Sequence, residues 1–413
     1  MSHPRREDVE EVLPLTPLQA GMVFQAALAP GSSVDLVQVE YHVAGADSDL
    51  LEASWREVVA RHPALRTTFH WEGLPRPLQA THRRVDLPVT RDDWRGLGQA
   101  EVAAALARYL AEDRARSIRL DQPPLMRFFL ARTGEREHRL IWTLHHALVD
   151  GWSRVVVERE VEAVYRALDA GETPSLPMPA YRRLFVDWIS RQDPVPAAQY
   201  WAERLAGPSE AAPLAAIGGR GESPGPSTVR WELDDAVSAA LRHEARRGGL
   251  SPSAVVHGAW AALLGRYADV DDVTFGSTVS GRATDLPGID RMVGLLANTL
   301  PVRVNVRGSL RGADLMSDVQ EQLLEMQRFQ HCALWDVRDW GGQPGRSPFD
   351  SICVFDREPA MTAGTPGGRL LRQIRAHERP GIPMSVLAAM GPRLRVSLLY
   401  ERGAFERSTA SRS

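Results

Sequence analysis

Alternating apolar and polar residues predict the first strands of the chain. Residues 34–43 (VDLVQVEYHV) show the period-two pattern of a half-buried strand. Two further apolar runs, residues 125–131 (LMRFFLA) and 138–144 (HRLIWTL), are separated by a polar stretch around Gly134. We predict that these two runs form neighbouring strands joined by a turn, because Gly and polar residues favour tight connections.

Helical periodicity predicts long helices beside these strands. In residues 49–61 and 153–170, apolar side chains recur every three or four positions, which places them on one face of a helix. Gly171 follows the second segment and predicts its C-terminal end. Further along the chain, Ser251 and Pro252 are typical of a helix start, with Ser as the cap and Pro in the first turn.

The pattern restarts after residues 207–226, which are rich in Gly, Pro and Ala and predict an exposed loop. Strand candidates in this second part are residues 228–233, 273–280, 299–306, 351–355 and 394–400. Helix candidates are residues 234–247, 251–267 and 313–328. Because strands and helices alternate in both parts, we predict two α/β halves of similar size, joined near residues 172–200.

The composition indicates a globular enzyme rather than a nucleic-acid-binding or membrane protein. Hydrophobic residues make up 44% and charged residues 24% of the 413 residues, which suffices for a core. The 49 basic and 52 acidic residues leave a net charge of −3, too balanced for a general phosphate-binding surface. No apolar run approaches the ~20 residues that span a bilayer, and no secretory signal follows Met1. We therefore expect a cytoplasmic protein without nucleic-acid or membrane partners.

Two residue types narrow the chemistry further. The chain contains Arg but no Lys, which excludes a catalytic Lys, Schiff-base chemistry and a P-loop. Only two cysteines occur, Cys332 and Cys353, which excludes a disulfide framework and a zinc cluster. We therefore expect no bound metal.

One segment, residues 144–151 (LHHALVDG), combines residues of catalytic type. His145 and His146 end an apolar strand, on which successive side chains alternate between faces. One imidazole can then face a cavity while its neighbour is buried and hydrogen-bonded. Because the ordinary pKa of histidine is ~6.5, the cavity-facing one is a candidate general base. Asp150 would orient the turn through an Arg, and Gly151 would let the backbone bend and bring an N–H to the site.

Two other interpretations of the histidine pair remain open from the residues alone. Both could be structural histidines, hydrogen-bonded in place at a strand end. Metal binding is less favoured, because adjacent strand residues diverge and no third ligand lies nearby in the sequence.

Residues 145–151 resemble the HHxxxDG motif of nonribosomal peptide synthetase condensation domains, which are chloramphenicol-acetyltransferase-like acyltransferases. Companion segments follow in the family's order along nearly the whole chain. They are residues 15–22 (LTPLQAGM), 61–69 (RHPALRTTF), 200–201 (YW), 281–282 (GR) and 292–303 (MVGLLANTLPVR). Two departures are a partial match at residues 331–334 (HCAL) and an end soon after Phe405, earlier than a complete domain predicts.

The resemblance implies an α/β fold of the α+β sandwich type. It implies two chloramphenicol-acetyltransferase-like halves that form a V-shaped pseudo-dimer, with an active-site tunnel between them. The N-terminal half would comprise residues 1–175 and carry HHxxxDG. The C-terminal half would comprise residues 176–413, with bridging latch and floor-loop segments.

The resemblance also implies a function in the biosynthesis of nonribosomal peptides, such as antibiotics and other secondary metabolites. The enzyme would form an amide bond between a carrier-bound acyl or peptidyl thioester donor and a carrier-bound aminoacyl acceptor. His146 would be catalytic, either taking a proton from the attacking amine or stabilising the tetrahedral intermediate. His145, Asp150 and Gly151 would support it, with the Gly151 N–H near the oxyanion.

Further roles follow from the same resemblance. Asp150 would pair with an Arg, and the candidates are Arg61, Arg66 and Arg282. Substrate contacts are expected from Ser153 and Asn298, although Asn298 could instead stabilise a turn. Trp201 is expected in the core rather than at the substrate.

The chain shows no carrier motif and no nucleotide-binding loop, so activated groups must arrive from elsewhere. By resemblance, they arrive on the phosphopantetheine arms of donor and acceptor carrier proteins, and the chain itself binds no cofactor. Neighbouring synthetase domains are further expected partners, and we expect a monomer. Arg182 and Arg183 form one candidate carrier-docking patch, or else a solvated helix face. Two alternative functions are an ester-forming, free-standing relative and a non-catalytic module that docks on carrier proteins.

Overall fold

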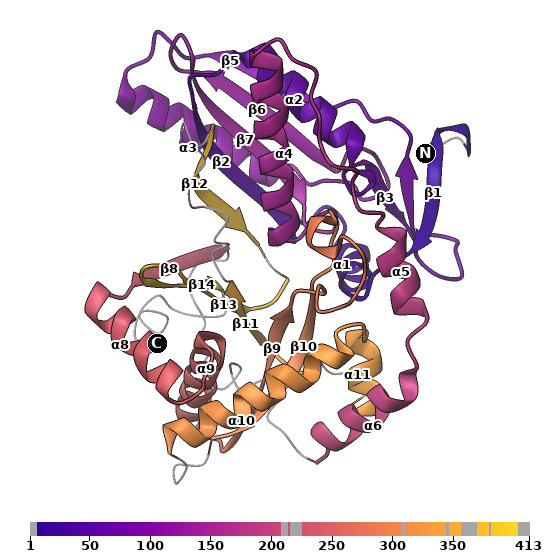
Figure 1. Ribbon diagram of the computed structural model, residues 1–413, viewed down its shortest axis with the longest axis vertical. Coiled ribbons are helices and arrows are strands. Elements are labelled where there is room, and N and C mark those ends of the chain that lie inside the picture. Colours follow the sequence, from indigo (N-terminus) through magenta and orange to yellow (C-terminus); the bar gives the residue numbers. More distant parts are fainter. Residues whose placement is uncertain are drawn as a thin grey trace. The chain divides into compact units, whose positions relative to one another are not determined.

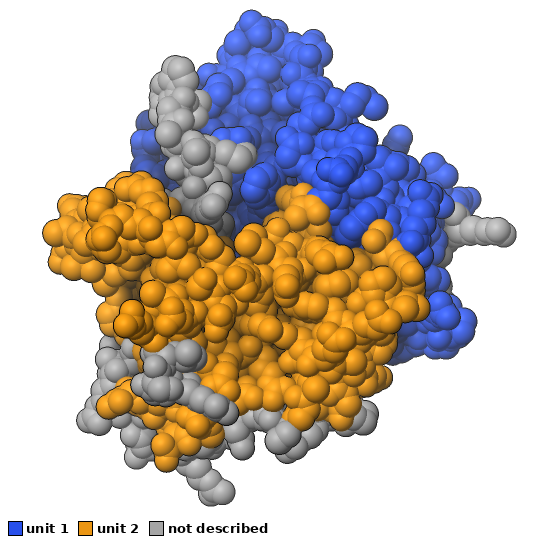
Figure 2. Space-filling model, turned by 60° about the horizontal axis from the view of Figure 1, so that its bottom comes forward, with its two compact units in different colours: residues 1–191, 284–296, 365–381 blue, residues 192–283, 297–364, 382–413 orange. Residues whose placement is uncertain are grey.

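The structure is a computed structural model that divides into two units, coloured blue and orange in Figure 2. It describes residues 6–207, 214, 225–306, 311–343, 347–356, 370–379 and 381–403. Unit 1 comprises residues 1–191, 284–296 and 365–381, and unit 2 comprises residues 192–283, 297–364 and 382–413. The predicted boundary between residues 175 and 176 thus falls within unit 1. Most of the predicted loop 207–226, and Phe405, lie outside the described residues.

Unit 1 contains a five-stranded sheet with the order β12–β2–β7–β6–β5 (Figure 1). The strands are β2 (Leu36–Ala44), β5 (Val89–Asp93), β6 (Met126–Arg132), β7 (Glu137–His145) and β12 (Leu371–Glu378). Pairing is antiparallel except between β5 and β6. β12 comes late in the chain and pairs with β2, so the sheet combines distant parts of the sequence.

Two helices, α2 (Ser48–Arg61) and α4 (Gly151–Asp169), pack beside each other on one face of this sheet (Figure 1). Trp55 of α2 lies on Phe128 and Trp142, with ring centroids 4.7 and 4.9 Å away. These two sheet residues share a face because side chains alternate along each strand. Helix α4 ends at Asp169, and Gly171, two residues later, has a φ of +72°, the left-handed conformation that glycine favours after a helix, as predicted.

The opposite face of the sheet is covered by α3 (Gln99–Ala115). Phe129 and Ile141 follow and precede Phe128 and Trp142 in their strands, so their side chains lie on the opposite face. There they pack with Leu106 and Leu110 of this helix. The central strands of this sheet are therefore covered on both sides, and β7 is buried along most of its length.

A three-stranded antiparallel sheet, β1–β4–β3, completes unit 1. Its strands are β1 (Val9–Pro14), β3 (Thr67–His70) and β4 (Leu78–His82). Helices α1 (Pro17–Leu28) and α5 (Arg183–Ser190) also belong to this unit. Short 3-10 turns occur at η1 (Arg6–Asp8), η2 (Pro63–Arg66), η3 (Ile289–Arg291) and, in unit 2, η4 (Met326–Phe329).

Unit 2 is built on a six-stranded sheet with the order β10–β9–β11–β13–β14–β8. The strands are β8 (Pro226–Glu232), β9 (Asp272–Val279), β10 (Asn298–Asn305), β11 (Ser351–Asp356), β13 (Met384–Met390) and β14 (Leu394–Glu401). The helices are α6 (Pro194–Arg204), α8 (Asp235–Arg247), α9 (Pro252–Ala268), α10 (Gly312–Glu325) and α11 (Leu334–Trp340). Trp201 is fully buried in the core of this unit, as expected. The Ser251 hydroxyl caps α9 by accepting from the Ala254 N–H at 3.1 Å, which confirms the predicted helix start.

The mixed α/β architecture predicted from periodicity is confirmed, and the predicted helices and strands are present with shifted ends. The elements that were not predicted are helices α1, α3, α6 and α11 and strands β1, β3, β4, β5, β12 and β13. No helix among the described residues is long and apolar enough to cross a membrane.

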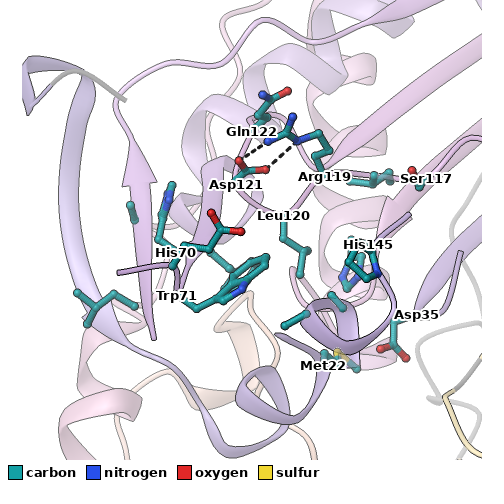
Figure 3. Close-up of a pocket in the computed structure, with 18 of the residues that line it drawn as sticks. Met22, Asp35, His70, Trp71, Ser117, Arg119, Leu120, Asp121, Gln122 and His145 are labelled. Carbon is teal, nitrogen blue, oxygen red and sulfur yellow. Dashed lines mark hydrogen bonds and ion pairs between the residues drawn. The ribbon is translucent and has the colours of Figure 1, made fainter. Parts of the chain in front are cut away.

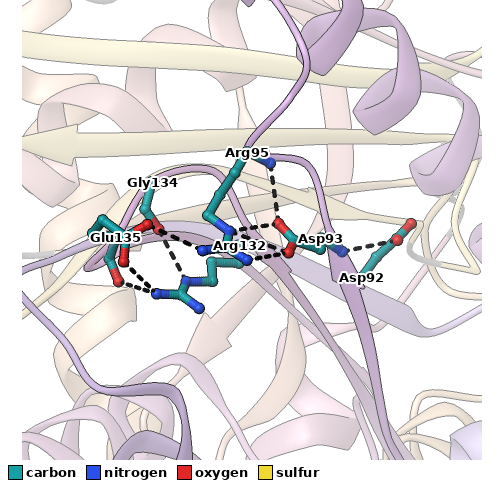
Figure 4. A network of polar contacts seen from close by, with 6 residues as sticks. All are labelled: Asp92, Asp93, Arg95, Arg132, Gly134 and Glu135. Carbon is teal, nitrogen blue, oxygen red and sulfur yellow. Dashed lines mark hydrogen bonds and ion pairs between the residues drawn. The ribbon is translucent and has the colours of Figure 1, made fainter.

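Charged residues form a surface network where β5 and β6 end (Figure 4). Arg95 donates to Asp93 and to Glu135, and Arg132 also donates to Glu135. The hydrogen bonds from Arg95 lower the pKa of Asp93 to about 2. Because every member is substantially exposed, the network contributes little stability.

Candidate active site

The two histidines predicted to carry chemistry follow each other where β7 ends. His145 is the last residue of the strand, and its backbone N–H donates to the carbonyl of Leu125 at 3.0 Å. Its side chain is buried, and its Nδ1 accepts from the Ala147 N–H at 3.2 Å. Burial, with a smaller contribution from the neighbouring imidazole, lowers the pKa of His145 to about 3. His145 is therefore neutral at physiological pH and carries its proton on Nε2.

His146 is held differently and is only partly buried. Its backbone N–H donates to the carbonyl of Asp35 at 2.8 Å. Its Nδ1 lies 2.9 Å from the carbonyl oxygen of Val149. A carbonyl can only accept, so Nδ1 carries the proton, and in the neutral ring Nε2 keeps a lone pair. The two imidazoles thus adopt opposite tautomers, and His146 has that of a general base.

Asp150 fixes the turn that follows by capping α4. One carboxylate oxygen accepts from the Ser153 N–H at 2.8 Å, and the other accepts from the Leu296 N–H at 3.0 Å. The Asp150 N–H donates to the carbonyl of Gly294 at 3.2 Å. The prediction expected Asp150 to orient the turn through an Arg. In the structure, its carboxylate also acts directly on two backbone N–H groups, and its pairing with an Arg stays a prediction.

Ser153 ties the same loop to α4. Its fully buried hydroxyl donates to the Gly294 carbonyl at 2.8 Å and lies 3.1 Å from the Gly294 N–H. This geometry gives Ser153 a structural role, and the expected substrate contact stays a prediction. The loop itself is core, since its apolar residues Met292, Val293, Leu295 and Leu296 are all buried.

The first sequence motif converges on the histidine turn as well. Gln19 of α1 donates through Nε2 to the carbonyl of Ala147 at 3.0 Å. The Thr16 hydroxyl donates to the carbonyl of Leu295 at 3.3 Å, and Thr16 N–H donates to the Gln19 side chain at 2.9 Å. Three segments that are far apart in the sequence therefore support one turn.

Gly151 is the first residue of α4 and is exposed. Its φ is not in the left-handed region, and a Cβ built on it meets nothing within 4 Å. The prediction that the backbone bend needs this glycine is therefore wrong. Its N–H belongs to the first turn of the helix, where backbone N–H groups lack intrahelical acceptors, and the oxyanion role stays a prediction.

Two of the three arginines predicted to pair with Asp150 pair with other carboxylates. Arg61 donates to Glu160 at 3.0 Å, and Arg66 donates to Glu10 at 2.7 Å. Neither of them is a partner of Asp150, because each is engaged by a nearer carboxylate.

Two candidate residues lie in unit 2. Asn298 is buried, and its Nδ2 donates to the carbonyls of Gln330 and Cys332 at 2.9 and 2.7 Å. Its Oδ1 accepts from the Thr299 N–H at 2.9 Å, so both amide protons and one acceptor position serve the local backbone. Asn298 thus joins the start of β10 to the distant segment at residues 330–332, and a substrate contact stays a prediction. The pairing of Arg282 with the carboxylate of Asp150 stays a prediction.

The candidate docking patch at Arg182 and Arg183 is also corrected. Arg182 is buried, and its guanidinium donates to the side chains of Gln79, Thr67 and Thr81. Burial lowers the pKa of Arg182 to about 10, so the side chain is still charged at neutral pH. Only Arg183 remains exposed, so the pair does not form a basic surface patch.

Sequence reasoning missed a cavity of about 850 Å³ in unit 1 (Figure 3). Its wall is mostly apolar, with Met22, Phe69 and Leu120 among its residues, and it also includes Asp35. Of the two histidines, His145 lines this cavity and His146 is not among the described lining residues, so the imidazole that faces it is not that of the proposed base. Nothing in the sequence singles out Asp35 as a functional residue, because it is one polar position of the strand predicted at residues 34–43. In the structure it precedes β2 with a φ of +60°, and its carbonyl accepts from His146.

Comparison with known proteins matches nearly the whole chain to one protein family. The family model described as "Condensation domain" matches residues 9–413. The chain is 38% identical over 407 residues to a protein of the linear gramicidin synthase of Brevibacillus parabrevis, covering 96% of this chain and 8% of that protein. It is 36% identical over 338 residues to chondramide synthase cmdD of Chondromyces crocatus, covering 81% of this chain and 8% of that protein. The chain therefore spans only a small part of these relatives.

Solved structures share the fold. The first condensation domain of the calcium-dependent antibiotic synthetase, in complex with a substrate analogue, superposes with a TM-score of 0.79 at 21% identity. The match covers 98% of this chain and 94% of that one. The starter condensation domain of rhizomide synthetase gives a TM-score of 0.76 at 18% identity, with 98% and 93% covered.

Proposed function

Because the chain belongs to the condensation-domain family, we propose that it forms an amide bond between an acyl or peptidyl thioester donor and the amine of an aminoacyl acceptor. Condensation domains of this family are acyltransferases. The observation that carries the proposal for this chain is the tautomer of His146. Its Nδ1–H is engaged by the Val149 carbonyl, which leaves Nε2 able to accept a proton.

The reaction balances around that nitrogen. The amine nitrogen of the acceptor attacks the thioester carbonyl carbon, and the C–S bond breaks as the C–N bond forms. The acceptor nitrogen must lose a proton, which His146 Nε2 takes. The departing thiolate receives a proton from the same imidazole, so the histidine returns to its starting state. Positioning of the two substrates supplies much of the remaining rate.

The residues around His146 support this role without taking part in proton transfer. His145 stays neutral, so it adds no charge that would oppose protonation of its neighbour. Asp150 and Ser153 hold the turn on two sides through backbone hydrogen bonds. We assign these three residues positioning roles and keep the catalytic role for His146.

The proposal includes the partners that deliver the substrates. The relatives are peptide synthetases, and we propose that donor and acceptor groups reach this chain on the phosphopantetheine arms of carrier proteins, with neighbouring synthetase domains beside it. The chain itself binds no cofactor in this proposal. The identities of both substrates, a monomeric state and a cytoplasmic location stay predictions.

The test supplies a carrier loaded with a donor thioester together with amine and alcohol acceptors, and identifies products by intact-protein mass spectrometry. The expected result is an amide product with the wild-type chain and loss of that product with His146→Ala. An ester product would replace the proposal with the ester-forming alternative. Carrier binding without any product would favour the docking module.

A further inference from the structure

The cavity of unit 1 has one charged group buried beside His146. Asp35 is only 7% exposed and belongs to the cavity wall, and its own carbonyl accepts from the His146 N–H at 2.8 Å. The same residue therefore borders both the cavity and the catalytic histidine. Figure 3 shows Asp35 and His145 near each other, apart from His70 and Trp71.

The Asp35 carboxylate is poorly satisfied for a buried anion. Its hydrogen-bond donor, within the part of the chain that the structure describes, is the backbone N–H of Gly381. An ionised carboxylate can accept about four hydrogen bonds. Burial raises the pKa of Asp35 to about 6, against the opposing effect of His146. A bound cation would remove much of this penalty, because it would supply both charge and donors.

The backbone of Asp35 is also strained. Asp35 and Asp269 are the two residues other than glycine with positive φ in the described part of the chain. Asp tolerates this conformation better than most residues, but it is seldom populated. Strain and an under-satisfied buried charge at one residue beside a catalytic histidine are typical of a functional position.

The other charged groups of the cavity do not compete for a cation. Arg119 donates to both carboxylate oxygens of Asp121, at 3.0 and 2.6 Å, so these two neutralise each other. Glu72 is exposed to solvent. The rest of the wall is mostly apolar, with Met22 and Leu120 among its buried residues. The cavity therefore offers one buried anion beside a large apolar volume.

We propose that this cavity binds the acceptor, with the Asp35 carboxylate holding its α-ammonium group beside His146 and the apolar wall receiving its side chain. The substrate class is an α-aminoacyl thioester with a large apolar side chain. Asp35 would act as a binding residue. The bound ammonium loses its first proton to solvent, and the neutral amine then attacks the thioester while His146 Nε2 takes the second proton. The proposal rests on the proposed function, and it favours amide over ester formation, since an alcohol acceptor carries no cation.

The test measures binding, so it does not depend on turnover. Calorimetry compares leucyl pantetheine amide, N-acetyl-leucyl pantetheine amide and glycyl pantetheine amide on the full chain. We expect the wild-type protein to bind the leucyl compound about tenfold or more tightly than either of the others. The first difference reports the ammonium, and the second reports the apolar side chain.

Two variants separate the two parts of the site. Asp35→Asn keeps the positive φ, which Asn also tolerates, and should abolish the preference for the free amine while keeping that for leucyl over glycyl. Ala26→Phe, which fills the cavity from α1, should abolish the leucyl preference and keep the amine preference. Asp269→Asn is the matched control, an exposed Asp of unit 2 with φ of +54°, and should bind as wild type.

The outcomes separate the two proposals. Equal binding of the amine and the N-acetyl compound by the wild-type chain, or an unchanged amine preference in Asp35→Asn, overturns the Asp35 assignment. Amide formation by the chain with such a result would leave the proposed function intact. Selective amine binding without any amide product would instead overturn the proposed function and retain this site.

Discussion

At the scale of single residues, the two histidines of the HHxxxDG segment have different roles. His146→Ala should lower turnover about 100-fold or more with little change in melting temperature, because this ring is only partly buried and its side-chain hydrogen bond is to a single backbone carbonyl, that of Val149. His145→Ala should instead destabilise the chain by about 1–3 kcal/mol, because it leaves the buried Ala147 N–H without its acceptor. Steady-state rates and thermal unfolding of both variants check this. Full activity in His146→Ala, with loss of activity in a folded His145→Ala, would reverse the two roles.

Asp35 predicts an unusual dependence of stability on pH. Its pKa in the folded chain is raised to about 6, above the ~3.9 of an unfolded Asp. The folded state therefore prefers the protonated carboxyl, and that contribution is present below about pH 4 and lost as the pH rises through about 6. The groups that face it are the His146 imidazole, which opposes the shift when charged, and the Gly381 N–H.

Removing the Asp35 charge should accordingly stabilise the protein at neutral and higher pH. We expect Asp35→Asn to unfold at a higher temperature than the wild type at pH 8, with the difference shrinking at pH 5. Thermal unfolding across this range measures it. A higher melting temperature together with weaker acceptor binding is the signature of a residue kept for function at the expense of stability. A lower melting temperature at pH 8 would indicate a structural role.

Substitution of Gly151 tests whether the substrate approaches this residue, because the fold itself tolerates a side chain there. A Cβ at this position meets nothing within 4 Å, so Gly151→Ala should leave the melting temperature unchanged or slightly raised. If the substrate approaches this N–H closely, the added methyl group should still lower kcat/KM by about tenfold or more. Full kcat/KM in the Ala variant would show that the reacting carbonyl does not approach this residue.

At the scale of elements, Asp150 connects the start of α4 to the buried loop at residues 292–296, because its carboxylate accepts from a backbone N–H of each. Asp150→Asn keeps the shape but can accept only one of the two backbone N–H groups that the carboxylate accepts. We expect a loss of about 1–3 kcal/mol in the free energy of unfolding, with a fall in activity as the histidine turn loosens. Denaturant titration and turnover measure the two effects.

Asp234→Asn is the matched control for this variant. Asp234 caps α8 by accepting from the Val237 N–H, at an exposed position. Asn caps helices about as well as Asp, so this variant should be close to neutral. Equal effects of the two substitutions would mean that the second N–H, from Leu296, adds nothing to the turn.

At the scale of the whole molecule, the net charge of −3 provides no general attraction for a carrier protein. Arg182 is buried, which removes one candidate docking patch, so recognition must use other local contacts. We expect a carrier-loaded donor to have a much higher kcat/KM than the matching pantetheine thioester, because contacts remote from the reacting atoms contribute to catalysis. Equal values would identify a small-molecule acyltransferase.

Features that depend on neighbours along the chain could be predicted from the amino-acid order. Period-two and helical patterns located the central strands and helices, and local chemistry located the cap at Ser251 and the stop at Gly171. The histidine pair at a strand end followed from the same local reasoning. Strand β13 was not predicted, because its short Ala-rich run shows no alternation of apolar and polar residues.

Which distant residues share a site depends instead on the folded chain. The carboxylates that pair with Arg61 and Arg66, the backbone partners of Ser153, and the burial of Arg182 all come from other parts of the sequence. Asp35 shows the reason most clearly. Its charge matters because folding removes it from water beside an imidazole more than 100 residues away in the sequence, and no local pattern encodes that environment.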